Sequence, residues 1–246
     1  MIPIGRICAI NRYPVKSMAG VSSETAALGW HGLAGDRRFA FRRLGDAGSF
    51  PWLTASRLPD LLRYRPVEFE ERGGEPSPTH VLTPSGSRFG LQSAELRDEI
   101  AERLGSPVEM MWLRNGIFDD AAVSLIAGTT IAHLGREGGL ELDPRRFRAN
   151  IVIESDAPEP FHEDAWVGKV LVFGDADSAG PAVSVTQRDL RCSMINLDPD
   201  TAEQDARVMK TVARLNAAHA GVYATVVRCG AVRVGDRVGV VREASQ

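Results

Sequence analysis

The residues with the clearest chemical potential lie in one short stretch, residues 186–201, where a single cysteine stands among ionisable and hydroxyl side chains. Arg188 and Arg191 precede this cysteine, Cys192. Guanidinium charge favours the thiolate, which is the form that binds a metal or attacks an electrophile, so Cys192 is a candidate metal ligand or nucleophile. A second interpretation stays open at this point, because free cysteines are often small, inert residues of the core.

The same stretch closes with a turn-forming sequence, Asp-Pro-Asp-Thr, at positions 198–201. Aspartate favours the first position of a turn, and proline fixes φ at the next position. Asp198 and Asp200 are therefore expected to hold the turn that positions Cys192. A direct catalytic role for either carboxylate is the alternative.

Two loops near the N-terminus carry candidate anion-binding groups. A proline interrupts the first predicted strand, so Lys16 and Ser17 follow at a strand end or in a loop, where binding groups are often displayed. The glycine-rich segment 29–36 leads into Arg37 and Arg38, whose guanidinium groups suit bidentate binding of phosphate. A lysine that is merely solvated is the alternative for Lys16.

The overall composition is that of an ordinary globular protein. The chain has 246 residues, enough for one large or two modest domains, with 43% hydrophobic residues and a formal net charge of −3. We expect neither nucleic acid nor a membrane as a partner, because there is no basic excess and no apolar run of spanning length. No secretory signal is recognised, and three widely spaced cysteines suit free thiols, so we expect a cytoplasmic protein.

Several familiar catalytic and cofactor sites are excluded by the motifs. Three cysteines cannot supply the four thiolates of a typical iron–sulfur cluster, and their spacing excludes a zinc ribbon. His162 and Glu163 begin like a metalloprotease motif, but the second histidine four residues on is missing. No P-loop, Rossmann glycine fingerprint or Gly-x-Ser-x-Gly elbow occurs, and pyridoxal phosphate is not expected.

The periodicity predicts many short strands with a few helices between them. The clearest helix spans residues 94–104, between a serine cap and a glycine stop. We expect a strand over residues 4–10 to bury Cys8, residues 71–78 to form a loop, and residues 232–240 to form a hairpin. This pattern predicts a mixed α+β fold dominated by an antiparallel, barrel-like sheet.

Seven short motifs together give the chain a family resemblance. In chain order they are Tyr-Pro-Val-Lys-Ser (13–17), Gly-Asp-Arg-Arg-Phe (35–39), Leu-Thr-Ala-Ser (53–56), Phe-Arg-Ala-Asn-Ile-Val-Ile (147–153), Glu-Asp-x-Trp (163–166), Arg-Cys with Asp-Pro-Asp-Thr (191–201) and Val-Arg-Val-Gly-Asp-x-Val (232–238). The chain resembles MOSC-domain proteins related to the mitochondrial amidoxime-reducing component and to the C-terminal domain of molybdenum cofactor sulfurase. This resemblance implies an N-terminal MOSC β-barrel domain over residues 1–115 and a MOSC domain over residues 116–246.

By position, the resemblance also implies a site. It assigns Cys192 as the catalytic thiolate ligand of molybdenum. Contacts with the pterin or its phosphate fall to six further residues: Lys16, Ser17, Arg37, Arg148, Asn150 and Arg191. The implied cofactor is molybdenum–molybdopterin (Moco), whose dithiolene would supply the other sulfur ligands. Two departures from the amidoxime-reducing relatives, at residues 127–130 and at Leu190, bear on the pterin contacts and the substrate range.

The function that the resemblance implies is that of a molybdenum-dependent oxidoreductase that reduces N-hydroxylated small molecules. Electrons would come from a separate ferredoxin, flavodoxin or cytochrome-type reductase, since the cysteine count excludes a ferredoxin-like domain in the chain itself. An alternative is a protein that carries the molybdenum cofactor, or a persulfide on Cys192, without turnover. A further alternative is a domain that keeps the scaffold and binds neither metal nor pterin.

Overall fold

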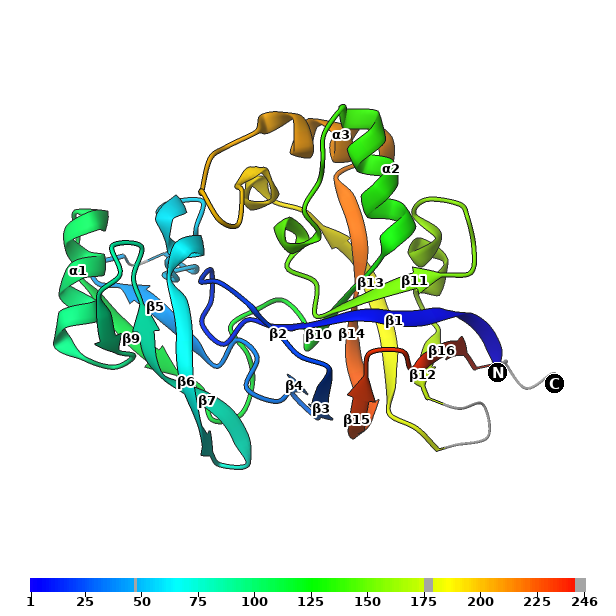
Figure 1. Cartoon of the computed structure of the whole chain (residues 1–246), viewed down its shortest axis with the longest axis horizontal. Helices are drawn as coiled ribbons and strands as arrows, with labels where there is room; N and C mark the ends of the chain where they lie inside the picture. The colour runs from blue at the N-terminus through cyan, green and yellow to red at the C-terminus, as the bar shows by residue number, and fades with distance from the viewer. Residues whose placement is uncertain (47, 175–178, 242–246) are drawn as a thin grey trace.

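A closed barrel of seven strands forms one half of the computed structural model, which describes residues 1–46, 48–174 and 179–241 (Figure 1). In order around the barrel, the strands are β11 (Ile151–Ser155), β10 (Val123–Ala127), β14 (His219–Arg228), β13 (Ala182–Leu190), β12 (Val170–Phe173), β16 (Arg237–Val240) and β1 (Ile2–Arg12). Pairing between β11 and β1 closes the ring. Every neighbouring pair is antiparallel except β10 with β11, which confirms the predicted antiparallel, barrel-like sheet.

The barrel is filled with apolar side chains and is also covered on part of its outside. All of β10 and the first three residues of β11 are buried. Helices α2 (Gly128–Gly138) and α3 (Ala206–Asn216) pack their apolar faces against the outer residues Ile126 and Val152. Strands covered on both faces form continuous apolar runs in the sequence, as residues 125–127 and 151–153 of this parallel pair do. Each fully buried Val, Leu or Ile contributes about 1.5–3 kcal/mol.

The seam between β1 and β11 depends on a glycine and a bulge. Gly5 has φ of +150°, and a Cβ at this position would lie 2.1 Å from the carbonyl oxygen of Glu154. The pairing register shifts between Ile7 and Ala9, so Cys8 is the extra residue and its side chain is exposed. The prediction that Cys8 belongs to the core was wrong, because it assumed an unbroken alternation along the strand.

The other half of the molecule holds smaller sheets and one long helix (Figure 1). Its elements are β5 (Phe39–Arg43), η1 (Pro59–Arg63), β6 (Arg65–Arg72), β7 (Glu75–Leu82), β8 (Arg88–Gly90), α1 (Ala94–Leu104) and β9 (Val108–Trp112). Helix α1 has its predicted bounds. Its first turn is capped by Ser93, whose Oγ accepts a hydrogen bond from the Leu96 backbone at 3.3 Å. The helix ends at Gly105, which has φ of 74°.

The prediction of a loop over residues 71–78 was wrong, because most of this segment belongs to the hairpin of β6 and β7. Gly73 and Gly74, both at positive φ, form the turn. Pro76 and Pro78 lie within β7. This strand pairs with β8 only over its last three residues, so at the prolines β6 is its only neighbour in the sheet. A proline with one strand neighbour removes no hydrogen bond that the ladder needs.

A small sheet connects the two ends of the chain. Strand β15 (Gly230–Arg233) pairs with β3 (Thr25–Gly29), which pairs with β4 (Gly32–Leu33). The predicted hairpin over residues 232–240 was therefore wrong, since β16 pairs with β1 and β12 instead. Alternation predicts a strand without identifying its partner. The domain boundary after residue 115 stays a prediction, and strands from both sides of it share sheets.

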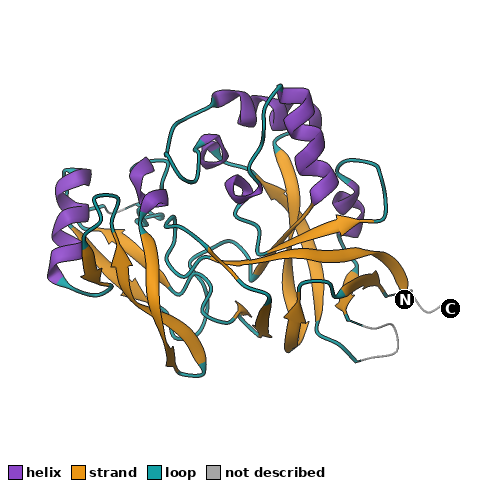
Figure 2. Ribbon diagram, viewed as in Figure 1, coloured by secondary structure: helices purple, strands orange, loops and turns teal. Residues whose placement is uncertain are grey.

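Loops and short helical turns lie between the two halves (Figure 2). Among them are η2 (Pro144–Phe147) and η4 (Ser193–Asn196), whereas η3 (His162–Trp166) packs beside the barrel. The two-residue strand β2 (Val21–Ser22) pairs with the end of β1. The Oδ1 atom of Asp198 accepts hydrogen bonds from the backbones of Asp200 and Thr201, both at 3.0 Å, so Asp198 holds the turn that follows η4. None of the helices in the described ranges combines the length and apolar character that crossing a bilayer requires.

Candidate functional site

A cavity of about 350 Å³ lies where loops of the two halves meet, and we call it the thiol cavity. Six of the seven residues singled out from the sequence line it: Lys16, Ser17, Arg37, Arg148, Arg191 and Cys192. The seventh, Asn150, is buried behind the wall and accepts a hydrogen bond from Arg37 Nη1 at 3.1 Å. The fold thus brings together residues that are far apart in the sequence, because β1, β11 and β13 belong to one barrel.

Cys192 stands at the end of β13 and immediately before η4. Its backbone is extended, with φ of −98° and ψ of 173°, and its side chain is exposed. The interpretation of Cys192 as a buried core residue was therefore wrong. Cys8 and Cys229 are exposed as well, but of the three cysteines only Cys192 lines the thiol cavity.

The two arginines that precede Cys192 are bound to other groups. Arg188 pairs with Asp164 at 2.9 Å and donates to Asn216 Oδ1 at 2.6 Å. Arg191 pairs with Asp189 at 2.9 Å and donates to the backbone carbonyls of residues 147 and 220. Both arginines therefore fasten the end of β13 to its neighbours. The free positive charge of the cavity comes from elsewhere.

Two other cations of the thiol cavity have no carboxylate partner. Lys16 Nζ donates to the Phe118 carbonyl at 2.8 Å, and Arg148 Nη1 donates to the Met18 carbonyl at 2.8 Å. Neither forms an ion pair with any residue in the described ranges. Burial lowers the pKa of Lys16 and lowers the pKa of Arg148 to about 10. Buried charges are usually paired, so these two cations suit an anion that binds in the cavity.

Arg37 acts as the centre of a buried hydrogen-bond network. Its guanidinium pairs with Asp36 and Asp119, both at 2.5 Å, and donates to the Arg148 carbonyl at 2.8 Å. Burial alone would lower the pKa of Arg37, but the two aspartates raise it. Asn150 extends the network, because its Nδ2 donates to the Asn11 carbonyl at 3.1 Å. The hydrogen bonds of Arg37 and Asn150 therefore connect β1 and β11 to the cavity wall. Direct contact of either residue with a ligand stays a prediction.

Three cavity residues have strained backbones. Ser17, Arg37 and Arg148 have φ values of 65°, 46° and 50°. Residues other than glycine seldom adopt this left-handed region, and such strain is concentrated at binding sites and active sites. The strain fixes the direction in which each of these side chains leaves the main chain.

Sequence reasoning missed several acidic and aromatic groups of the thiol cavity, among them Asp119, Asp189 and Tyr223. Burial alone would raise the pKa of Asp119, but the charges of Arg37 and Lys16 lower it. Burial raises the pKa of Asp189 to about 6, and it also raises the pKa of Tyr223. Asp189 could have been found as the acidic residue three positions before Cys192. Asp119 and Tyr223 carry no comparable signal.

Comparisons with known proteins agree with this architecture. A family model described as the MOSC N-terminal beta barrel domain matches residues 4–87, and one described as the MOSC domain matches residues 114–239. The molybdenum cofactor sulfurase of Drosophila grimshawi is 25% identical in an alignment of 239 residues that covers 82% of this chain. The aligned part is 29% of that protein, so the chain spans less than a third of its relative's length.

One solved structure shares the fold at low identity. The YUAD protein from Bacillus subtilis is 14% identical with a TM-score of 0.51, and the match covers 96% of this chain and 94% of that one. The YiiM protein from Geobacillus stearothermophilus is 18% identical with a TM-score of 0.36, over 50% of this chain and 55% of that one. With both domains matched in the same order along the chain, the protein belongs to the family of MOSC-domain proteins.

Proposed function

We propose that this protein binds a molybdenum–molybdopterin cofactor in the thiol cavity and reduces N-hydroxylated small molecules, in the cytoplasm, with electrons from a separate donor protein. The observation that carries the proposal is the placement of an exposed thiol, Cys192, in one cavity with Lys16 and Arg148, two cations without a carboxylate partner among the residues that the structure describes. A thiolate suits the metal, and the cations suit the phosphate of the pterin.

The donor set of the cavity fits such a group. The described residues contain no cluster of three or more His, Cys, Asp and Glu side chains that could hold a metal alone. A metal beside Cys192 would thus take one soft ligand from the chain and the remaining sulfurs from the cofactor. The Nη2 atom of Arg148 is buried and finds no hydrogen-bond partner within residues 1–46, 48–174 and 179–241, so an anion bound in the cavity could accept its hydrogen bond.

The residues of the thiol cavity would then have the following roles. Cys192 supplies the thiolate, while Lys16 and Arg148 bind anionic oxygens. Ser17 lines the cavity, and its hydroxyl, which donates to Met194 Sδ at 3.8 Å, would offer a hydrogen bond to the ligand. Arg191 fixes the strand end next to the thiol through Asp189 and two carbonyls.

The bound group would supply a two-electron relay. In the overall reaction an N–O bond of the substrate breaks, two electrons and two protons are taken up, and water leaves. The chain can hold one of these protons on Asp189, whose pKa of about 6 lies near neutrality and whose Oδ2 accepts from Ser124 Oγ at 3.2 Å.

The test is turnover of the cofactor-loaded protein with an aryl amidoxime as substrate and a reduced viologen dye as electron donor. The expected result is formation of the amidine, with one equivalent of amidine per two electrons taken from the dye. The Cys192→Ser variant should form none, and Cys229→Ser, which changes an exposed thiol outside the cavity, should retain the activity. Equal turnover by Cys192→Ser and the unchanged protein would overturn the proposal.

The exposure of Cys192 also favours a second candidate, a carrier that holds the cofactor or a persulfide and passes it on. The name of the curated relative, a molybdenum cofactor sulfurase, supports the same candidate. Transfer of cofactor or sulfur to a cofactor-free acceptor enzyme, with no amidine formed in the assay above, would select this function.

A further inference from the structure

We propose that a second cavity, next to the thiol cavity, binds an organic phosphate. This basic cavity has a volume of about 370 Å³ and is lined by five arginines: Arg63, Arg65, Arg145, Arg146 and Arg148. It shares Arg146, Arg148 and Met194 with the thiol cavity, and Cys192 is not in its wall. The site does not require a cofactor at Cys192.

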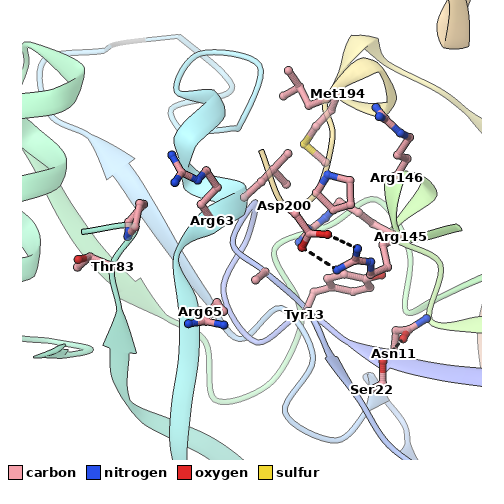
Figure 3. Close-up of a pocket in the computed structure, with 17 residues that line it drawn as sticks. Asn11, Tyr13, Ser22, Arg63, Arg65, Thr83, Arg145, Arg146, Met194 and Asp200 are labelled. Carbon is pink, nitrogen blue, oxygen red and sulfur yellow. Dashed lines mark hydrogen bonds and ion pairs between the residues drawn. The ribbon is translucent and has the colours of Figure 1, made fainter. Parts of the chain in front are cut away.

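Three of the five arginines of the basic cavity are paired with carboxylates. Arg63 pairs with Asp60 at 3.3 Å, and Arg145 pairs with Asp143 at 2.6 Å. Asp200 brings a carboxylate to the wall, and Arg145 holds both of its oxygens, at 2.5 and 3.0 Å (Figure 3). Arg146 pairs with Asp198 at 2.9 Å. Arg65 forms no ion pair within the described part of the chain, and neither does Arg148. Arg65 is therefore available to an anion, and so is Arg148 as long as no cofactor engages it from the thiol cavity.

Two buried polar atoms of the same wall have no partner. Tyr13 is 2% exposed and Arg148 is 7% exposed, and both Tyr13 Oη and Arg148 Nη2 lack a hydrogen bond among the described residues. A buried polar group left unsatisfied costs about 1–3 kcal/mol. Folded proteins rarely accept this cost twice in one place without a ligand or a water to offset it.

Phosphate is the anion that best matches this arrangement. Arg65 and Arg63 come from β6 and η1 on one side of the cavity, and Arg145 and Arg146 come from η2 on the opposite side (Figure 3). Guanidinium forks on several sides suit a group with three or four oxygens better than they suit a planar carboxylate. The side chain of Thr83 adds a neutral polar group to the wall.

The size of the cavity indicates a phosphate ester and not the free ion. Its volume equals on the order of ten water molecules at about 30 Å³ each, so inorganic phosphate would fill a small part. Apolar residues line the remainder, among them Leu62, Pro84 and Leu197. A phosphomonoester or diphosphate ester with a ring or sugar body meets both requirements.

Isothermal titration of the full chain at low ionic strength tests the site, with ribose 5-phosphate and adenosine 5′-monophosphate as probes and with ribose and adenosine as phosphate-free controls. The expected result is saturable binding of at least one phosphate ester, absent for the controls. Arg65→Glu should weaken this binding at least about tenfold. Arg65 is exposed, so this variant should keep its fold.

Arg72→Glu is the matched control, because it makes the same change on the same strand, roughly 23 Å further along at about 3.3 Å per residue. It should leave the affinity for the probe unchanged. Cys192→Ser should bind the probe as the unchanged protein does, because Cys192 is not in the wall of the basic cavity. The site is overturned by absence of saturable binding for both esters, by equal losses in the two arginine variants, or by loss of binding when the thiol is removed.

Discussion

The guanidinium carbon of Arg148 lies 4.1 Å from the centroid of the Tyr13 ring, and this aromatic face takes the place of a carboxylate partner. Arg37 contacts the same ring at 5.0 Å. A ring face attracts a cation without neutralising its charge, so the cation keeps its attraction for a ligand. The tyrosine therefore allows two arginines to be buried side by side next to an anion-binding cavity.

Replacing Arg148 with glutamine separates its contribution to binding from its contribution to stability. We expect Arg148→Gln to retain at least about tenfold less pterin. The midpoint of thermal unfolding of the cofactor-free protein should not fall, because the variant removes a buried charge whose pKa is already lowered by burial. Pterin fluorescence after oxidation and a thermal melt measure the two effects. Unchanged pterin content in the variant would show that Arg148 does not contact the cofactor.

For Asn150 we expect the opposite: its replacement should lower stability, because its hydrogen bonds are made within the protein. Its Oδ1 accepts from Arg37 and from the Ser124 backbone, the latter at 3.0 Å. Asn150→Leu leaves these donors unsatisfied and should lower the free energy of unfolding by about 1–3 kcal/mol. Denaturant titration measures this loss. The same change at the exposed Asn115 should alter stability by less than about 0.5 kcal/mol, and equal effects at the two positions would contradict the proposed network.

Asp189 predicts a pH dependence of stability. Its pKa is raised from the usual value of 3.8 to about 6 in the folded protein, so folding favours its protonated form. The stability that this group contributes is fully present below pH 4 and is lost as the pH rises through about 6. Asp189→Asn should therefore become more stable relative to the unchanged protein between pH 4 and pH 7. A stability difference that stays constant over this range would contradict the raised pKa.

The barrel seam can be tested at Gly5. A Cβ would meet the Glu154 carbonyl at 2.1 Å, and the φ of +150° disfavours any side chain, so Gly5→Ala should destabilise the fold by at least about 2 kcal/mol. At Gly29 the nearest atom to a new Cβ lies 3.9 Å away, and Gly29→Ala should be tolerated. Chemical denaturation measures the free energy of unfolding of the two variants and tests this prediction. Equal stabilities would mean that β1 and β11 do not close the barrel in this register.

The sequence predicted most of the individual elements but fewer of their partners. Helix α1 followed from local chemistry alone, since a serine cap, a periodic apolar face and a glycine stop are all encoded within a few residues. The pairing of β15 with β3 and the outward position of Cys8 depend on contacts between distant strands and on a bulge. Periodicity contains no information about either of these.

At the candidate site, too, some residues could be predicted from the sequence and others could not. Motifs and the family resemblance brought Cys192, Lys16 and Arg148 to attention, and the fold places all three in one cavity. The role of Arg191 was not predictable, because its hydrogen-bond partners include a carbonyl on β14. The basic cavity was missed as well, since its arginines stand in separate segments that become neighbours only when the two halves meet.

The most direct test of the central claim is the molybdenum content of the purified chain, produced in a host that makes the cofactor. The proposed site predicts molybdenum and pterin in a stoichiometric ratio to the protein, and loss of the metal in Cys192→Ser with an unchanged melting temperature. The exposed position of Cys192 makes that variant a test of binding and not of folding. Equal molybdenum in the variant and the unchanged protein, or none in either, would contradict the assignment of this thiol as the metal ligand.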